Sequence, residues 1–344
     1  MTELRIDLGR LRRNVRVVAE RMAPAALMLV VKDDAYGHGV EPVVSAALEE
    51  GVGWIGAFDV ATGVRAKTVA RARARVFAWL TVGHDEVAEA LWAGLELGVG
   101  DAGYLERVAA CAADAGTTAV VHLKIDTGLH RNGVRPEEWP GFVARAARLE
   151  RDGVLRVAGV WSHISEASDE DDDDARAAFL HAVDAARAAG LTPEVRHLAA
   201  SAAAWHRGEF RADLVRVGAF CYGIRSADGP DIPGIAPAAT LVTHVTRVMG
   251  DLVEIGVGSL DGLFSTLAGR IAVGTPAGAR ALVEVHETAS TVDGWTSASV
   301  GDEVVVFGPG SSGEASATTL AERVGTVGEE VLLRVSPLVP RVVV

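Results

Sequence analysis

The sequence predicts an eight-stranded α/β barrel followed by a smaller, all-β domain. Short apolar segments alternate with helical ones through the first two-thirds of the chain, and this alternation stops near Ser226. Strands that alternate with helices form a parallel sheet whose two faces are both covered. Eight such repeats fit a closed barrel better than an open, doubly wound sheet, which is the alternative.

The barrel strands should be buried on both faces, so we place them at continuous apolar runs. These runs lie at 27–32, 53–57, 76–80, 95–99, 118–125, 155–161, 194–198 and 213–217. The stretches between them are rich in Ala, Arg and Glu, and those at 40–50 and 175–189 have helical spacing. They predict the helices that cover the barrel.

The second domain follows the segment SADGPDIPGIAP (226–237), whose Pro, Gly and Asp residues are typical of a linker. We therefore divide the chain into a barrel at 1–226 and a β domain at 227–344. Strands are predicted at 240–248, 252–257, 270–273, 281–286, 303–307 and 330–335, and one helix at 318–323. About the first ten residues, with a strand around 4–8, are expected to pack on the β domain.

Charge and composition exclude several classes of partner. The formal net charge of −13 argues against a surface for nucleic acids or anionic membranes, where Lys and Arg must predominate. Cys111, in an Ala-rich stretch, is expected in the core, and its distance from Cys221 argues against a disulfide framework. No signal-peptide pattern opens the chain, and no run reaches the roughly 18 to 20 apolar residues of a membrane span. We expect a cytoplasmic protein.

The acidic run DEDDDD (169–174) offers carboxylates that could bind a divalent cation. We favour a solvated loop that leads into a helix, because a helix N-terminus attracts negative charge. The sequence therefore predicts no metal site.

Polar residues follow the predicted barrel strands at their carboxyl ends. They are Lys32, Asp126, His163, Ser201, Arg216 and Gly218. The carboxyl ends of barrel strands meet at one mouth, where active sites lie, so these residues predict a single site. Lys32 is the most informative, since a lysine at the end of a buried strand is costly unless it has a function. A desolvated neutral amine is nucleophilic, as a Schiff base requires; the alternative is a side chain that reaches out to solvent.

Five strings of residues carry a resemblance to a known family. They are VVKDDAYGHG (30–39), HLKIDTGLHRNGV (122–134), WSHIS (161–165), HLAASAA (197–203) and DLVRVGAFCYGI (213–224). In this order they resemble the alanine racemase family of fold-type III pyridoxal phosphate enzymes, over nearly the whole chain. The resemblance implies a pyridoxal 5'-phosphate cofactor, a small amino-acid substrate and a head-to-tail homodimer in which each β domain completes the other subunit's site.

The resemblance assigns the reacting groups residue by residue. Lys32 matches the lysine that forms the internal aldimine and acts as one base. Arg131 matches the arginine near the cofactor's phenolic oxygen and the substrate carboxylate. Lys124 matches a lysine that is carbamylated in many members and orients that arginine.

The resemblance also assigns the groups that hold the cofactor. His163 matches the histidine that stacks on the pyridine ring, and Arg216 matches the arginine that faces the pyridine nitrogen. The phosphate ligands correspond to Tyr36, Ser201 and the backbone amides around Gly218 and Ala219. Because arginine stays protonated, Arg216 should leave the pyridine nitrogen neutral, which favours reprotonation of the α-carbon over side reactions.

The sequence departs from the family at the second base, which is a tyrosine of the β domain. The corresponding string is GVGSLDGLFS (256–265), which places Ser259 at the tyrosine position. A serine hydroxyl is a far weaker acid than a phenol and needs its own base. His286, or a water held by Ser259 and Asp261, is the expected substitute.

Other family positions have changed as well. Glu329 stands where a late tyrosine contacts the phosphate, Ala200 replaces an asparagine, and Asp33 adds a charge beside Lys32. His286 and Glu287 stand near the expected Met-Asp pair. Because these losses concentrate in the β domain, cofactor binding is expected to survive while the reaction or the substrate has changed.

Three functions are therefore compatible with the sequence. The first is an amino-acid racemase with Lys32 as one base and Ser259, in an altered role, at the position of the other. The second is a decarboxylase or aldolase-like enzyme, since one-sided chemistry needs only Lys32. The third is a non-catalytic protein that binds the cofactor, against which the retained Lys124 and Arg131 argue.

Overall fold

The computed structural model describes residues 1–80, 83–198 and 201–344, and it divides into two compact units. The barrel unit comprises Val18–Lys32 and Ala47–Gly218. The β unit comprises Met1–Val17, Asp33–Ala46 and Ala219–Val344.

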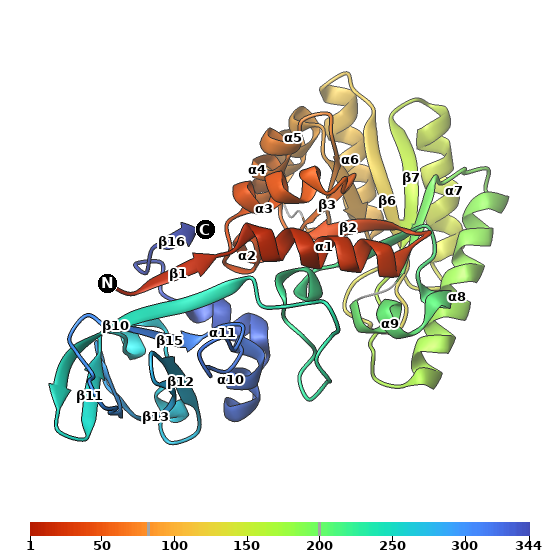
Figure 1. Cartoon of the computed structure of the whole chain (residues 1–344). Helices are drawn as coiled ribbons and strands as arrows, with labels where there is room; N and C mark the ends of the chain where they lie inside the picture. The colour runs from red at the N-terminus through yellow and green to blue at the C-terminus, as the bar shows by residue number, and fades with distance from the viewer. Residues whose placement is uncertain (81–82, 199–200) are drawn as a thin grey trace. The chain divides into compact units, whose positions relative to one another are not determined.

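Eight parallel strands form the barrel, as the sequence predicts (Figure 1). They are β2 (Ala26–Val30), β3 (Trp54–Ala57), β4 (Arg75–Ala78), β5 (Glu96–Val99), β6 (Ala119–Lys124), β7 (Leu155–Trp161), β8 (Val195–His197) and β9 (Leu214–Val217). They pair in the order β9-β2-β3-β4-β5-β6-β7-β8. The barrel closes between β8 and β9, where the Asp213 amide donates to the Arg196 carbonyl at 3.2 Å. The Arg196 guanidinium also binds the Asp213 carboxylate at 2.7 and 2.9 Å. The open-sheet alternative is therefore wrong.

Helices cover the outer face of these strands (Figure 1). They are α4 (Val60–Ala70), α5 (His84–Ala93), α6 (Ala102–Asp114), α7 (Trp139–Arg151), α8 (Asp169–Ala188) and α9 (Ser201–His206), while α1 (Leu8–Met22) and α3 (Val40–Glu49) contribute residues to both units. Asp59 and Asp101 cap α4 and α6 by accepting backbone N–H groups at 2.7 Å in each case. Such side-chain caps satisfy amides that have no partner inside the helix.

The acidic run at 169–174 lies inside α8, so its prediction as a loop is wrong. Ser168 caps this helix by accepting from the Asp171 amide at 3.1 Å. The carboxylates then lie in the first turns, where the positive end of the helix dipole stabilises them.

Large side chains fill the barrel interior, and strand glycines make room for them. The main cluster is Met28, Trp54, Phe77, Trp161 and Leu214. A Cβ atom at Gly98 would lie 2.9 Å from ring atoms of both Phe77 and Trp161. A Cβ atom at Gly159 would lie 2.3 Å from Nδ1 of His122. Both glycines are therefore required by close packing and not by backbone conformation.

The β unit holds a second, mostly antiparallel sheet (Figure 1). Its strands are β1 (Glu3–Ile6), β10 (Ala239–Met249), β11 (Leu252–Ile255), β12 (Ala272–Thr275), β13 (Gly278–Val285), β14 (Ser290–Asp293), β15 (Glu303–Phe307) and β16 (Arg341–Val343). β10 and β11 pair and so close six of these strands into a small barrel. The N-terminal strand β1 pairs antiparallel with β10 and parallel with β16.

The segment 330–335 is not a strand but belongs to helix α11 (Gly328–Arg334), so that prediction is wrong. Its Glu329 and Glu330 lie in the first turn and Arg334 in the last, which suits the helix dipole. The predicted helix at 318–323 is confirmed as α10 (Ala317–Val324). Strands β14 and β16 were not predicted, because they are only four and three residues long.

Both cysteines are buried and free. Cys111 lies in α6, in the core, as expected. Within the described residues, no helix is both long and apolar enough to cross a membrane.

Candidate active site

Basic groups gather around His163 at the carboxyl ends of the barrel strands. Lys32 follows β2, Lys124 ends β6, Arg131 lies in the next loop and Arg216 lies on β9. Burial, followed by the positive charges of these four residues, lowers the pKa of His163 to about 3. The structure therefore brings five predicted site residues together, with His163 as a neutral imidazole.

Two of these residues are more exposed than the sequence suggests. The strand predicted at 27–32 ends at Val30, and Lys32 is half-buried at the start of the next turn. Arg131 is exposed. Both can therefore reach a small molecule that enters the mouth of the barrel.

Arg216 is buried and held by several acceptors. Its Nη1 donates to Nδ1 of His197 at 2.8 Å, and its Nη2 donates to the Ser162 carbonyl at 2.7 Å and to Nδ1 of His163 at 3.2 Å. Burial lowers the pKa of Arg216 to about 9, which leaves it protonated at neutral pH. No described residue accepts the Nε hydrogen, so this donor can serve a ligand.

Lys124 lies beside the ring of Trp161. Its Nζ is 4.5 Å from the ring centroid, and the Arg216 guanidinium is 5.0 Å from the same ring. Burial, Arg216 and Arg131 lower the pKa of Lys124 to about 8. The neutral amine is thus more abundant than in an ordinary lysine, and this is the form that reacts with electrophiles.

Sequence reasoning missed Trp161 and His197 as individual site residues. Trp161 stacks on the His197 ring, with centroids 5.6 Å apart and an interplanar angle of 5°. The signal was present in the strings WSHIS and HLAASAA, because Trp161 ends one predicted strand and His197 lies one residue before the end of another. Their role could not be read there, because the contact joins two different strands.

A left-handed turn follows Lys32. Asp33, Asp34, Ala35 and Tyr36 have φ between 52° and 56°, a region that costs non-glycine residues roughly 1–2 kcal/mol each. Asp34 stabilises the turn by accepting from the Val40 amide at 3.2 Å. Strain of this kind persists where the surrounding structure fixes it, and it concentrates at functional sites.

Tyr36 packs in the β unit, with its ring centroid 4.7 Å from that of Tyr222. Burial, and then the negative charge of Glu329, raise the pKa of Tyr36 above its usual value. Tyr36 therefore remains a hydrogen-bond donor at any ordinary pH.

Ser259 lies in a short turn of the β unit, next to His286. The Ser259 amide donates to the His286 carbonyl at 2.8 Å, and the Asp261 carboxylate accepts from the Gly258 amide at 2.8 Å. The His286 ring is exposed and lies 3.3 Å from the Glu284 carboxylate. The structure thus brings Ser259, Asp261 and the backbone of His286 into one loop cluster.

The remaining site residues lie at the ends of β8 and β9. Ser201 begins α9, and the amide of Ala203 in its first turn donates to the Glu166 carboxylate at 2.7 Å. Gly218 follows β9, and Ala219 begins the 3₁₀ turn Ala219–Tyr222 of the β unit. Ala200 lies outside the described residues.

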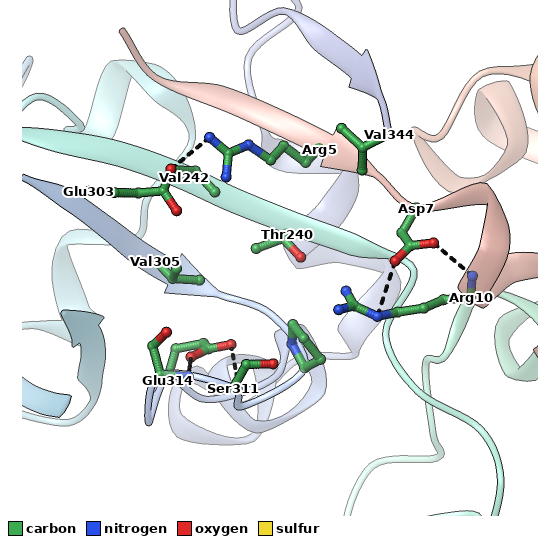
Figure 2. A pocket seen from close by; sticks show the side chains of 12 residues that line it. Arg5, Asp7, Arg10, Thr240, Val242, Glu303, Val305, Ser311, Glu314 and Val344 are labelled. Carbon is green, nitrogen blue, oxygen red and sulfur yellow. Dashed lines mark hydrogen bonds and ion pairs between the residues drawn. The ribbon is translucent and has the colours of Figure 1, made fainter. Parts of the chain in front are cut away.

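A separate pocket of about 250 Å³ lies in the β unit (Figure 2). Its charged side chains are already paired: Arg5 binds Glu303 at 2.7 Å, and Glu314 accepts three backbone N–H groups. No predicted site residue lines it. The pocket is therefore distinct from the basic cluster in the barrel.

Comparisons with known proteins agree with this fold. Residues 6–226 match the family model described as Alanine racemase, N-terminal domain. The alanine racemase of Thermobifida fusca is 36% identical, over 99% of this chain and 97% of that protein. Among solved structures, alanine racemase from Streptomyces coelicolor has a TM-score of 0.94 and 33% identity, over 100% of this chain and 98% of the other. The enzyme from Streptomyces lavendulae has a TM-score of 0.93 and 31% identity, over 100% and 97% of the two chains.

Proposed function

The chain belongs to the alanine racemase family of isomerases, and we propose that it is a pyridoxal 5'-phosphate-dependent racemase of alanine or another small amino acid. One arrangement carries the proposal: Arg216 donates to His163 and lies with Lys124 at the Trp161 ring, at the carboxyl ends of barrel strands that Lys32 and Arg131 follow. Pure binding of a cofactor would not need this whole set.

The donors present fit the cofactor. Arg216 has an Nε hydrogen that no described residue accepts, which suits a ring nitrogen. Lys32 would hold the aldehyde carbon covalently. Tyr36, Ser201 and the amides around Gly218 and Ala219 would bind the phosphate. Glu329 is the exception, because a carboxylate repels a phosphate unless it turns away.

Bound here, the cofactor would supply a ring that stabilises negative charge at the substrate α-carbon. Lys32 would remove or return the α-proton on one side. Arg216 stays protonated and withholds a proton from the ring nitrogen, which limits electron withdrawal and favours return of the proton to the α-carbon. Arg131 would bind the substrate carboxylate, with Lys124 orienting it.

The second proton-transfer group is assigned to the β unit. We propose a homodimer in which this unit of one subunit serves the barrel of the other, with Ser259 at the usual tyrosine position. The backbone hydrogen bond from Ser259 to His286 puts both residues in one loop cluster, and the base proposed there is the His286 imidazole or a water held by Ser259 and Asp261. We also propose that the enzyme works in the cytoplasm, which its two free cysteines suit.

The absence of a phenol at position 259 favours a second candidate, a decarboxylase or aldolase-like enzyme. One-sided chemistry needs only Lys32, and loss of an acid–base group typically costs about 10²–10⁴ in rate. Arg216 argues against it. Because it withholds a proton from the ring nitrogen, the cofactor ring would be a weak electron sink, which suits proton transfer better than carbon loss.

The test is incubation of the purified protein and cofactor with single L-amino acids in deuterated water, followed by NMR and chiral chromatography. Deuterium at the α-carbon with inversion is the expected result, with Lys32→Ala as the inactive control. Deuterium without inversion, or carbon loss, supports the second candidate. No exchange and no carbon loss would overturn both enzyme functions for these substrates.

A further inference from the structure

A chain of hydrogen bonds crosses the barrel interior from Arg216 to the opposite wall. Arg216 Nη1 meets His197 Nδ1 at 2.8 Å, and His197 Nε2 meets His122 Nδ1 at 2.8 Å. His122 Nε2 then meets the Glu96 carboxylate at 2.8 Å. All four side chains are buried, and they come from β9, β8, β6 and β5.

The two ends of this chain fix its direction. Arginine can only donate and a carboxylate can only accept, while a neutral imidazole does one of each. Arg216 therefore donates to His197 Nδ1, and His122 Nε2 donates to Glu96. The bond between the histidines must then run from His197 Nε2–H to His122 Nδ1. Every bond is satisfied only when both rings are neutral and carry their proton on Nε2.

The neighbouring charges agree with this assignment. Burial lowers the pKa of both His122 and His197, so both rings are neutral at ordinary pH. Burial alone would raise the pKa of Glu96, but the hydrogen bonds from His122 and Arg75 outweigh it and lower that pKa to about 2. Arg75 anchors the carboxylate from β4, with Nη2 2.8 Å from Oε2. Glu96 is therefore a permanent acceptor at the end of the chain.

The barrel wall is built around the two rings. Gly159 leaves the space that His122 Nδ1 occupies, since a Cβ atom there would lie 2.3 Å from that nitrogen. Trp161 stacks on the other face of the pair, against His197. Gly159 and Trp161 of β7 thus hold the two imidazoles in place, with an angle of 79° between the ring planes.

We propose that Glu96, His122 and His197 are positioning residues that hold Arg216 in one orientation for the cofactor. They tie Nη1 inward and leave the Nε hydrogen for the pyridine nitrogen. This inference rests on the proposed function and names the residues that act through Arg216. The carboxylate of Glu96 is the acceptor that ends the chain opposite the Arg216 donor, so its charge matters although it lies on the far side of the barrel.

The decisive variant is Glu96→Gln, with Glu194→Gln as its matched control. Glu194 also binds Arg75, at 2.8 Å, but its side chain is half exposed and takes no part in the chain. A glutamine at 96 has one acceptor oxygen and one NH₂ group. It therefore cannot replace both carboxylate oxygens as acceptors for Arg75 and His122. If its NH₂ group faces His122, both rings must change tautomer, and His197 Nδ1–H then points at the Arg216 donor.

The first readout is the ¹⁵N spectrum of labelled histidines, recorded with and without cofactor. The wild type and Glu194→Gln should show two buried histidines protonated on Nε2, and Glu96→Gln should lose or reverse that pattern. The second readout is the visible spectrum of the cofactor-loaded protein, which should shift in Glu96→Gln only. With alanine, kcat should fall about tenfold to a hundredfold with little change in KM.

A second pair of variants covers the case in which Glu96→Gln does not fold. His122→Gln keeps an acceptor toward His197 and a donor toward Glu96, whereas His122→Leu keeps neither. The wild-type spectrum and kcat should survive in the glutamine variant and be lost in the leucine variant. Unchanged histidine tautomers and an unchanged cofactor spectrum in Glu96→Gln would overturn the inference. The same spectrum and the same kcat in His122→Gln and His122→Leu would also overturn it. Failure of the wild type to bind cofactor would instead overturn the proposed function, and the cofactor-free histidine spectra would still decide the direction of the chain.

Discussion

Arg216 donates to Nδ1 of His197 at 2.8 Å, and both side chains are buried inside the barrel. This contact links the mouth of the barrel, where a ligand would bind, to a hydrogen-bond chain that ends at Glu96.

Gly159→Ala should disturb the histidine pair from the side. The new Cβ would lie 2.3 Å from His122 Nδ1 and must displace the ring, at a cost of about 1–3 kcal/mol in the free energy of unfolding. Chemical denaturation measures this loss, and the visible spectrum with cofactor should shift as well. Gly53→Ala, with nothing within 4 Å of its Cβ, is the control. Equal stability and identical spectra in the two variants would contradict the prediction.

Ser259→Tyr should raise the rate of racemisation. It restores a phenol whose pKa suits proton transfer, and a general acid–base group is worth about 10²–10⁴ in rate. Polarimetry with alanine measures the change, and an increase of at least about tenfold is expected. Ser259→Phe, which adds the ring without the hydroxyl, should give no increase. If both variants behave alike, the family position of the second base has been misassigned.

Glu329→Gln should strengthen cofactor binding. Glu329 raises the pKa of Tyr36, so its charge acts where the phosphate is expected. Removing it should lower the Kd for pyridoxal phosphate about tenfold, by relief of like-charge repulsion. Fluorescence titration gives the Kd, and Glu330→Gln, on the exposed side of the same turn, should leave it unchanged. A weaker affinity in Glu329→Gln would show that the carboxylate supports binding.

Lys124 should make stability rise with pH. Its pKa is lowered from 10.5 to about 8 in the folded state, so between these values the unfolded chain binds more protons. The cost of burying its charge is therefore present below pH 8 and is lost as the pH rises through that range. Relative to Lys124→Met, the wild type should gain about 2–3 kcal/mol between pH 7.5 and 10.5. Denaturation in buffer free of carbon dioxide measures this, and parallel curves would contradict it.

The barrel could be predicted from sequence because its strands are continuous apolar runs of regular spacing, as in LRVAGVW (155–161), which is β7 without change. The strand predicted at 330–335 is wrong because Val331, Leu332 and Val335 fit a strand as well as a helix. The segment forms a helix because Glu329 and Glu330 favour a helix start and because the helix packs against α10. Short apolar runs do not distinguish these cases by periodicity alone.

The candidate site was predictable where one residue ends one strand, as with Lys124 and Arg216. The chain from Glu96 to His197 was not, because it joins residues 26 and 75 positions apart along the sequence. Each of these side chains taken alone resembles an ordinary buried residue. Only the closed barrel brings their nitrogen and oxygen atoms within hydrogen-bond distance.

The central claim is that Lys32 holds the cofactor covalently, and the sequence makes it directly testable because its only lysines are Lys32, Lys67 and Lys124. The measurement is borohydride reduction of the cofactor-loaded protein, followed by peptide mass spectrometry. We predict a pyridoxyl group on the peptide that contains Lys32, and none after Lys32→Ala. A label on Lys67 or Lys124 instead, or no label at all, would contradict the account.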